Sequence, residues 1–164
     1  MTGPRGDQTV GLGHYAVARG GGTLACLGLG SCVAVVLHDP DAQVGGLAHV
    51  VLPSSSLSRD RSNPGRFAET AVPLLIAETL RAGAARGRLS ARLVGGASMF
   101  TNLIPAGAVQ MGQRNVNACR AALEAAAIPI AAEAVGGEIG RSVWLTVESG
   151  VVTVRSVGRG PEQL

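Results

Sequence analysis

Short apolar runs separated by glycines constrain the fold of this chain more than any other feature. The sequence has 164 residues and 24 glycines, and many of these glycines stand next to one another between runs of valine, leucine and alanine. Hydrophobic residues make up 46% of the chain but aromatic residues only 2%, so the core must be aliphatic. Such a chain is too apolar to be disordered. The pattern predicts several short, tightly connected strands in a single domain spanning residues 1–164.

The charge pattern argues against nucleic-acid and membrane partners. The net charge is +3, and all 14 basic residues are arginines scattered along the chain. A nucleic-acid surface usually combines clustered basic residues with stacking aromatic residues, which are scarce here. No apolar stretch reaches the roughly 18 residues of a membrane span, and the first residues lack the apolar run of a signal peptide. We therefore expect a cytoplasmic protein without membrane insertion, whose cysteines are thiols.

Hydrophobic periodicity predicts roughly seven or eight strands and two helices. The strands are expected at residues 13–18, 23–29, 32–38, 44–52, 91–94, 128–135, 142–147 and 151–157. Amphipathic helices are expected at about 69–84 and 113–127, with Pro73 tolerable only in a first turn. The polar segment 54–66 is expected to be an exposed loop. Together these elements predict an α/β sheet-and-helix sandwich with substantial antiparallel β-structure.

One predicted hairpin brings a cysteine toward a histidine. The β-rich runs on either side of the turn-forming segment Asp39–Ala42 are expected to pair. With a four-residue turn at this segment, Cys32 lies directly opposite His49, and opposed Cβ atoms are about 5 Å apart. An imidazolium beside a cysteine stabilises the thiolate, and the imidazole can then serve as general acid and base. The spacing therefore predicts a candidate site for nucleophilic catalysis.

Other interpretations of these residues stay open. A cysteine and a histidine on adjacent buried strands can simply pack against each other. Cys26, Cys32 and His49 could also bind zinc, although their intervals match no common ligand spacing. If the site is catalytic, Gly28 and Gly30 would let backbone N–H groups approach the substrate closely, and the amides near Ser31 and Cys32 would form an oxyanion hole. No cofactor is expected.

The remaining histidines and cysteine fit structural roles better. His38 shares a face with Cys32 but lies about 20 Å along the strand, and it is expected to cap the turn. His14 can approach the pair only through tertiary structure. Cys119 lies on the apolar stripe of the second predicted helix, which indicates a buried structural thiol.

The sequence resembles the CheD family over nearly its whole length. No single motif is decisive, but the set, in its order and spacing, is highly specific. The matching segments are Leu27-Gly28-Leu29-Gly30-Ser31-Cys32-Val33, Asp39-Pro40, Gly46-Leu47-Ala48-His49, Leu52-Pro53, Ala68-Glu69-Thr70-Ala71-Val72-Pro73, Gly95-Gly96-Ala97-Ser98-Met99-Phe100, Gly112-Gln113-Arg114-Asn115-Val116, Gly136-Gly137 and Gly140-Arg141-Ser142.

The resemblance implies a fold and an activity. It implies a cysteine hydrolase fold, an α/β sandwich shared with certain deamidating bacterial toxins. Members of the family hydrolyse selected glutamine side chains on the cytoplasmic helices of chemoreceptors to glutamate, and many bind a CheC-type phosphatase. The family nucleophile maps to Cys32 and its general base to His49. The implied enzyme is a protein-glutamine glutaminase.

One position departs from the family pattern. The family's usual third catalytic residue is a threonine six positions before the nucleophile, and Cys26 holds that place here. A hydroxyl accepts the imidazole N–H better than a thiol does, so either activity is reduced or a backbone carbonyl orients the ring. The departure keeps a second interpretation open, in which the chain is a weak or inactive binding module that regulates a phosphatase or a receptor. A cysteine protease or transglutaminase-like enzyme would share the same pair of residues.

Overall fold

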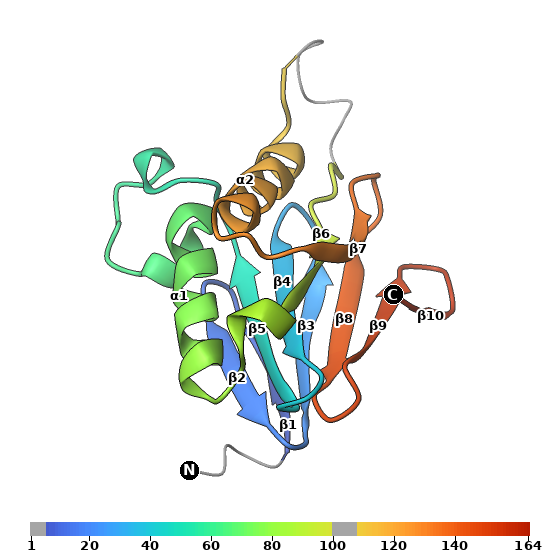
Figure 1. Cartoon of the computed structure of the whole chain (residues 1–164). Coiled ribbons are helices and arrows are strands. Elements are labelled where there is room, and N and C mark those ends of the chain that lie inside the picture. The colour runs from blue at the N-terminus through green and yellow to red at the C-terminus, as the bar shows by residue number, and fades with distance from the viewer. Residues whose placement is uncertain (1–5, 100–107) are drawn as a thin grey trace.

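Two five-stranded sheets and two α-helices build the part of the chain that the computed structural model describes, residues 6–99 and 108–164 (Figure 1). The first sheet, called the β3 sheet, has the order β1 (Asp7–Thr9), β3 (Thr23–Leu29), β8 (Arg141–Thr146), β9 (Val151–Ser156) and β10 (Pro161–Gln163). The second, called the β4 sheet, has the order β2 (Tyr15–Arg19), β5 (Val44–Val50), β4 (Val33–Asp39), β6 (Ser90–Gly95) and β7 (Ile130–Val135). The helices are α1 (Ala68–Arg81) and α2 (Met111–Ala125), with 3-10 turns at Ser55–Leu57, Pro64–Arg66 and Arg86–Arg88.

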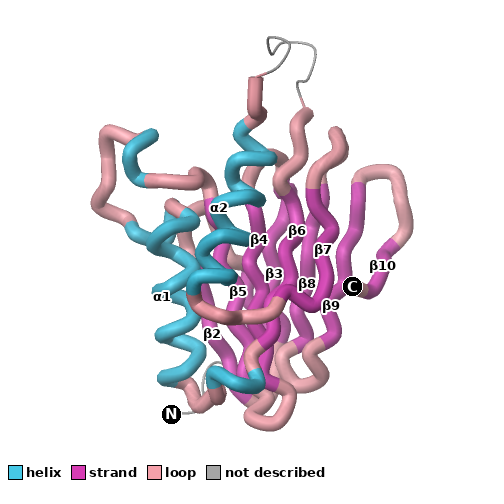
Figure 2. Tube along the Cα trace, turned by 45° about the horizontal axis from the view of Figure 1, so that its top comes forward, coloured by secondary structure: helices cyan, strands magenta, loops and turns pink. Residues whose placement is uncertain are grey.

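The β4 sheet is the middle layer of the molecule. Both helices lie on one side of the strands, as Figure 2 shows, and the β3 sheet packs on the other side. Strand β4 is buried on both faces because its side chains alternate between two cores. Val35 and Leu37 contact the core beneath the helices, whereas Ala34 and Val36 contact the core between the sheets.

Two glycines in β5 set the distance between these layers. A Cβ atom at Gly45 would lie 2.8 Å from Leu145 of the β3 sheet. A Cβ atom at Gly46 would lie 2.8 Å from the hydroxyl of Thr79 on α1. Side chains at these positions would push apart the layers on either side of β5, which also carries His49.

The predicted fold class is confirmed. Among the described residues, only the β1–β3 and β6–β7 pairs are parallel, and the other strand pairs are antiparallel. The predicted strands and both helices are present, with ends that differ by a few residues. The three-residue edge strands β1 and β10 were not predicted, because so short a segment carries no readable alternation. The segment 54–66 is mostly loop, as expected, but contains two 3-10 turns.

The prediction for Pro73 was wrong. This proline lies inside α1, five residues after its first residue Ala68, rather than in the first turn. A proline there removes the helical hydrogen bond to the carbonyl of residue 69. Glu69 is solvent-exposed, so water can satisfy that carbonyl at low cost.

Candidate active site

Cys32 lies immediately before β4, and its main chain is fixed by the end of β6. The Gly96 N–H donates to the Cys32 carbonyl at 2.8 Å, and the Ala97 N–H donates to the Gly30 carbonyl at 2.8 Å. Gly95 permits this close approach, because a Cβ atom there would lie 2.3 Å from the Cys32 carbonyl oxygen. The side chain of Cys32 is partly buried against the core between the sheets. The sulfur is therefore neither sealed inside the core nor fully open to solvent.

His49 lies on the same face of the β4 sheet, but the predicted register was wrong by two residues. His49 pairs with Ala34, not with Cys32. Because side chains on a strand alternate with a period of two, this shift leaves Cys32 and His49 on the same face as diagonal neighbours. Diagonal neighbours are about 7–8 Å apart at Cα, which is still within reach of a long side chain.

The register differs because Asp39 belongs to β4 and caps the turn that follows it. Its carboxylate accepts hydrogen bonds from the backbone of Asp41 at 3.0 Å and of Ala42 at 3.1 Å. The same carboxylate accepts from the Ala85 backbone at 2.7 Å and from Arg88 at 3.0 Å, as an ion pair. These bonds move the four-residue turn to residues 40–43, one position later than predicted.

The ring of His49 is oriented by the main chain. Its Nδ1 lies 3.0 Å from the Val10 carbonyl oxygen. A carbonyl only accepts hydrogen bonds, so Nδ1 carries the proton, and in the neutral ring Nε2 is left as an acceptor and base. Val10 is held in turn by its N–H bond to the Ala25 carbonyl in β3, at 2.7 Å. The imidazole is thus fixed in the tautomer that general-base catalysis requires.

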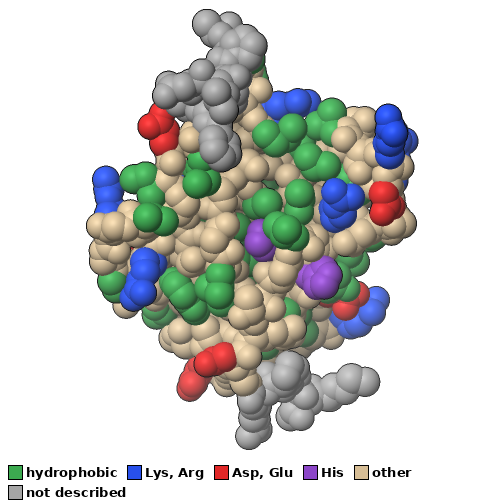
Figure 3. All heavy atoms as spheres, turned by 180° about the vertical axis from the view of Figure 1, so that it is seen from behind, with side chains coloured by type: hydrophobic (Ala, Val, Ile, Leu, Met, Phe, Trp, Pro, Cys, Tyr) green, Lys and Arg blue, Asp and Glu red, His purple; other side chains and the backbone are tan. Residues whose placement is uncertain are grey.

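The main chain of His49 is bonded to the segment just before β2. Its N–H donates to the His14 carbonyl at 3.0 Å, and its carbonyl accepts from Gly13 at 2.9 Å. Tertiary structure therefore does place His14, an exposed residue, beside His49. Histidine side chains reach the surface opposite the view of Figure 1, bordered by hydrophobic side chains (Figure 3). Leu12 and Leu27, in the segments next to the pair, are 63% and 50% exposed.

The electrostatics of the pair favour two neutral groups. Burial raises the pKa of the Cys32 thiol above its ordinary value of 9.0, and a hydrogen bond from its own backbone N–H only partly opposes this. Burial lowers the pKa of His49 below its ordinary value, and the bond to Val10 only partly opposes that shift. The expectation that Cys32 is already a thiolate at neutral pH therefore finds no support. A neutral thiol beside a neutral imidazole can still react when the ring takes the proton during attack.

Cys26 lies in β3 with its side chain in the core between the sheets, toward which Cys32 also packs. It is fully buried. Burial, and then the charge of a Cys32 thiolate, raise the pKa of Cys26 to about 12. Cys26 thus lies within electrostatic range of the candidate nucleophile. The hydrogen bond that orients His49 comes from Val10 instead.

One backbone N–H in the glycine segment before Cys32 is not free for a substrate. The N–H of Gly28 donates to the Ser142 hydroxyl at 3.0 Å, so it is already engaged. The amide of Cys32 stays a candidate oxyanion donor, as expected, and its interaction with the thiol of the same residue lowers the pKa of that thiol. A hollow of about 230 Å³ opens beside the preceding residue, Ser31, and Met99 and Met111 help to line it.

Asn115 belongs to one of the segments that resemble the CheD family, but the sequence did not indicate what it contacts. It is completely buried on α2. Its Nδ2 donates to the Ser31 carbonyl and to the Val51 carbonyl, both at 2.9 Å. One amide group therefore joins the residue before Cys32 to the segment that follows His49. The signal in the sequence was the place of this asparagine within the matching segment 112–116.

Other predictions for single residues had mixed outcomes. Cys119 is a buried thiol whose pKa burial raises to about 12, as expected. The prediction that His38 caps the turn was wrong, because its ring is buried and its Nε2 donates to the Val147 carbonyl at 2.8 Å. Phe100 of the quoted motif lies outside the described residues.

Neither a metal cluster nor a membrane-spanning helix is found in the ranges described. Within residues 6–99 and 108–164, three or more histidine, cysteine, aspartate or glutamate side chains nowhere gather in a way that could hold a metal ion. The same residues contain no helix with the length and apolarity to cross a bilayer.

Comparison with known proteins yields one consistent group of relatives. A family model described as "CheD chemotactic sensory transduction" matches residues 51–156. A protein of Moorella thermoacetica named "Probable chemoreceptor glutamine deamidase CheD" is 45% identical over 93% of this chain and 92% of its own length. "Chemoreceptor glutamine deamidase CheD" of Thermotoga maritima is 45% identical over 96% of both chains. A relative from Symbiobacterium thermophilum with the "Probable" name is 44% identical over 96% of both.

A solved structure is much less similar. The Bacillus licheniformis hypothetical protein YfiH aligns with a TM-score of 0.39 and 17% identity, over 68% of this chain and 46% of that chain. This similarity is too low to bear on fold or function.

Proposed function

Because this chain belongs to the CheD family, we propose that it hydrolyses glutamine side chains on the cytoplasmic helices of chemoreceptors to glutamate, with release of ammonia. Relatives aligned over nearly their full length carry the name of that activity. The observation that carries the proposal at the site is the bond from His49 to Val10. This bond leaves a basic ring nitrogen on the face toward which Cys32 also packs.

Cys32 acts as the nucleophile and His49 as the acid and base. Both groups start neutral, so Nε2 of His49 takes the thiol proton while the sulfur attacks the carboxamide carbon. The imidazolium then gives this proton to the departing ammonia, and a thioester remains on Cys32. Nε2 next takes a proton from water, which attacks the thioester, and glutamate and the free thiol are released.

The main chain around Cys32 supplies electrostatic stabilisation. Negative charge develops on the carboxamide oxygen during both attacks. The N–H of Cys32 is the proposed donor to this oxygen because it belongs to the same residue as the reacting sulfur, and the main chain around it is held by the bonds from Gly96 and Asn115. Removal of one such donor typically costs two to three orders of magnitude in rate, roughly 3–4 kcal/mol.

The setting of the reaction follows from its substrate. Receptor helices that carry the target glutamines lie in the cytoplasm, so the protein works there as a single domain over residues 1–164. A CheC-type phosphatase is the protein partner that family membership suggests, and a soluble complex of the two proteins in size-exclusion chromatography would test it.

One experiment tests the reaction and its nucleophile. The purified protein is incubated with a chemoreceptor cytoplasmic fragment, and peptides are analysed for the mass change of amide-to-acid conversion. We expect conversion by the wild type and by Cys119→Ala, which removes an unrelated buried thiol, but not by Cys32→Ala. Conversion that survives in Cys32→Ala would contradict the assignment.

A regulatory binding module is the second candidate function. The raised pKa of Cys32 favours it, because it weakens the case for an activated thiolate, and Cys26 stands where the family pattern has a threonine. Trapping with hydroxylamine separates the two, since only an acylated Cys32 yields a hydroxamate of the receptor glutamine. A protease would instead cleave the receptor main chain, and the same mass analysis would detect the resulting peptide fragments.

A further inference from the structure

A second hollow, of about 390 Å³, lies close to the candidate active site. It is bounded by the end of β3, the start of β8, and the end of β9 with the loop that follows. The β3–β4 connection and the start of β8 lie at the same end of the molecule in Figure 1. Its lining includes three arginines, Arg141, Arg155 and Arg159. No acidic residue is among the described residues that line it.

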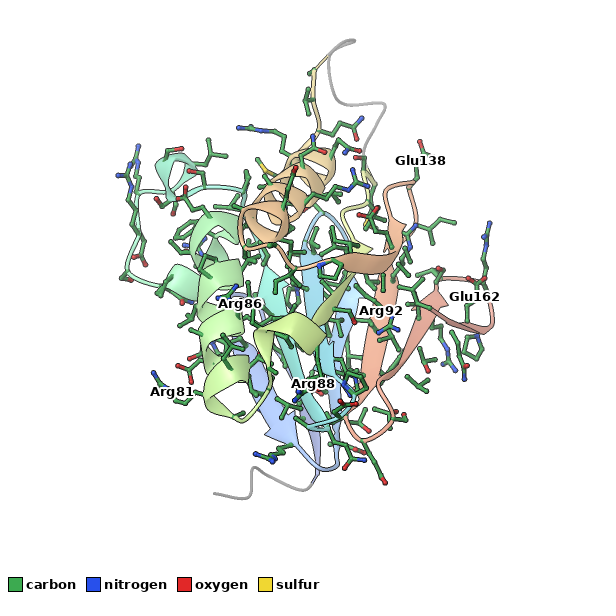
Figure 4. All side chains as sticks on the ribbon, in the orientation of Figure 1. Arg81, Arg86, Arg88, Arg92, Glu138 and Glu162 are labelled. Carbon is green, nitrogen blue, oxygen red and sulfur yellow. The ribbon has the colours of Figure 1, made fainter. Side chains whose placement is uncertain are left out.

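No acidic side chain of the described residues lines the hollow beside these arginines. The ion pairs found between described residues involve Arg81, Arg88 and Arg120 but none of the three arginines in the hollow. Neither Glu138 nor Glu162, which Figure 4 labels in this half of the molecule, lines the hollow. The hollow is therefore a concentrated positive surface on a chain whose net charge is only +3.

Arg141 is fixed in position. Its Nη1 donates to the Gly136 carbonyl at 2.7 Å, so the guanidinium cannot swing away into solvent without losing this bond. Burial, and then the neighbouring charge of Arg159, lower the pKa of Arg141. Two guanidinium groups thus repel each other across the hollow, and an anion between them would relieve this repulsion.

The hollow adjoins the nucleophile. Gly28 and Gly30 form part of its wall, and Cys32 follows two residues after Gly30. Met99 lines both this hollow and the smaller one beside Ser31. The hydroxyls of Ser142 and Ser156 lie among the arginines and can also donate hydrogen bonds to an anion. The arginines therefore lie beside the main-chain segment that leads to Cys32.

We propose that this arginine hollow binds a carboxylate on the receptor helix, so that the enzyme selects glutamines that have an acidic residue one or two turns away. The proposal rests on the proposed function, because it assigns specificity to the same reaction. A helix rises about 5.4 Å per turn, so an acidic residue one or two turns from the glutamine lies roughly 5–11 Å along the helix, which suits a hollow whose wall includes Gly30, two residues before Cys32. Arginine suits this role because its planar fork pairs with a carboxylate in a bidentate way.

The test compares two pairs of charge-removing substitutions. Arg155→Gln with Arg159→Gln neutralises the hollow. Arg81→Gln with Arg86→Gln removes the same charge from α1 and the turn after it, far from β9 in Figure 4. Both Arg155 and Arg159 are exposed, so folding is retained, which circular dichroism checks. For a receptor cytoplasmic fragment at low salt, we expect the hollow variant to raise KM about three- to tenfold with kcat unchanged, and the control to behave as the wild type.

Salt and substrate variants complete the test. The KM of the wild type should rise with ionic strength over the range where the Debye length falls to about 10 Å, and the hollow variant should respond less. Neutralising the acidic residues near the modified glutamine should raise KM in the wild type but add nothing in the hollow variant. Equal KM values and equal salt responses in all three proteins would overturn the proposal.

Binding of the same fragment separates this proposal from the proposed function. If the wild type binds the receptor but converts no glutamine, the reaction is wrong, and the hollow is judged by whether its variant binds several times more weakly. If the wild type does not bind the fragment, or if the hollow variant binds as tightly as the wild type, the carboxylate site is wrong.

Discussion

The Nδ1 of His49 is hydrogen-bonded to the carbonyl of Val10 at 3.0 Å, and this one bond decides the tautomer of the candidate base. Here the backbone carbonyl of Val10 orients the ring, a role that the family resemblance assigns to a side-chain hydroxyl. This carbonyl belongs to residue 10, so the bond does not depend on which side chain stands at position 26. A cysteine at that position is therefore compatible with an active enzyme.

Replacement of Cys26 by alanine is expected to leave kcat/KM on a receptor fragment within about threefold of the wild type. The reason is that the ring of His49 keeps its bond to Val10, and Cys26 contributes packing in the core between the sheets. Removing the sulfur should lower the free energy of unfolding by about 1 kcal/mol, which urea unfolding can measure. A loss of activity beyond thirtyfold in a protein that is still folded would show that Cys26 orients the ring.

The rate at which Cys32 is alkylated should keep rising above pH 9. Its pKa is raised by burial, so at each pH the thiolate fraction is smaller than that of an ordinary cysteine. Iodoacetamide labelling of the folded protein at pH 7.5 should therefore be slower than that of N-acetylcysteine. Cys26 and Cys119 are buried and should not react, which the Cys32→Ala variant checks. A rate that is already constant at neutral pH would contradict the neutral pair.

Much of the fold could be predicted from the sequence because local patterns determine it. The short apolar runs between glycines and turn residues, and the apolar stripes of both helices, placed most elements within a few residues. The hairpin register could not be predicted, because Asp39 is held by Ala85 and Arg88, which are distant in sequence. The error of two residues preserved the shared face of Cys32 and His49, since side chains alternate with that same period.

The candidate site was predicted only in part for a related reason. The thiol of a cysteine and the imidazole of a histidine are reactive groups that the residue type alone identifies, so Cys32 and His49 could be chosen from the sequence. The carbonyl of Val10 is chemically identical to every other carbonyl, and only the tertiary structure brings it to the ring. The same holds for Asn115, whose amide finds its two partners 84 and 64 residues away.

Asp39→Asn should destabilise the protein by about 2–3 kcal/mol at pH 7. Burial alone would raise the pKa of Asp39, but the bonds from Arg88 and from the backbone of Ala85, Ala42 and Asp41 hold it well below its usual 3.8. A carboxyl whose pKa is depressed in the folded state stabilises the fold at pH values above its pKa in the unfolded chain. For Asp39 this stabilisation is lost as the pH falls below about 3.8. The difference between variant and wild type in guanidinium unfolding should therefore shrink between pH 7 and pH 3.

Asp41→Asn is the matched control for that measurement. The Asp41 carboxylate is 73% exposed and lies 3.5 Å from Arg88, so its removal should change the unfolding free energy by less than about 0.5 kcal/mol. A variant difference for Asp39→Asn that is the same at pH 7 and pH 3 would show that the ionised form of Asp39 is not what stabilises this turn.

Asn115→Ala is expected to lower kcat about thirty- to a hundredfold with little change in KM. The amide of Asn115 fixes the Ser31 carbonyl, and because the peptide unit is planar, this also fixes the direction of the Cys32 N–H on its other side. A displacement of about 1 Å at the reacting atoms can cost two orders of magnitude in rate. Asn115→Asp, which keeps the shape but lacks the Nδ2 donors, should behave in the same way.

The control is Asn117→Ala, on the same helix but exposed, which should leave kcat unchanged. Thermal unfolding separates positioning from stability, because rates are compared at temperatures where each variant is folded. The alkylation rate of Cys32 across pH provides a second readout, since a shift of its N–H changes the one interaction that lowers the thiol pKa. Wild-type kcat and labelling in a destabilised Asn115→Ala protein would mean that Asn115 supports the fold alone.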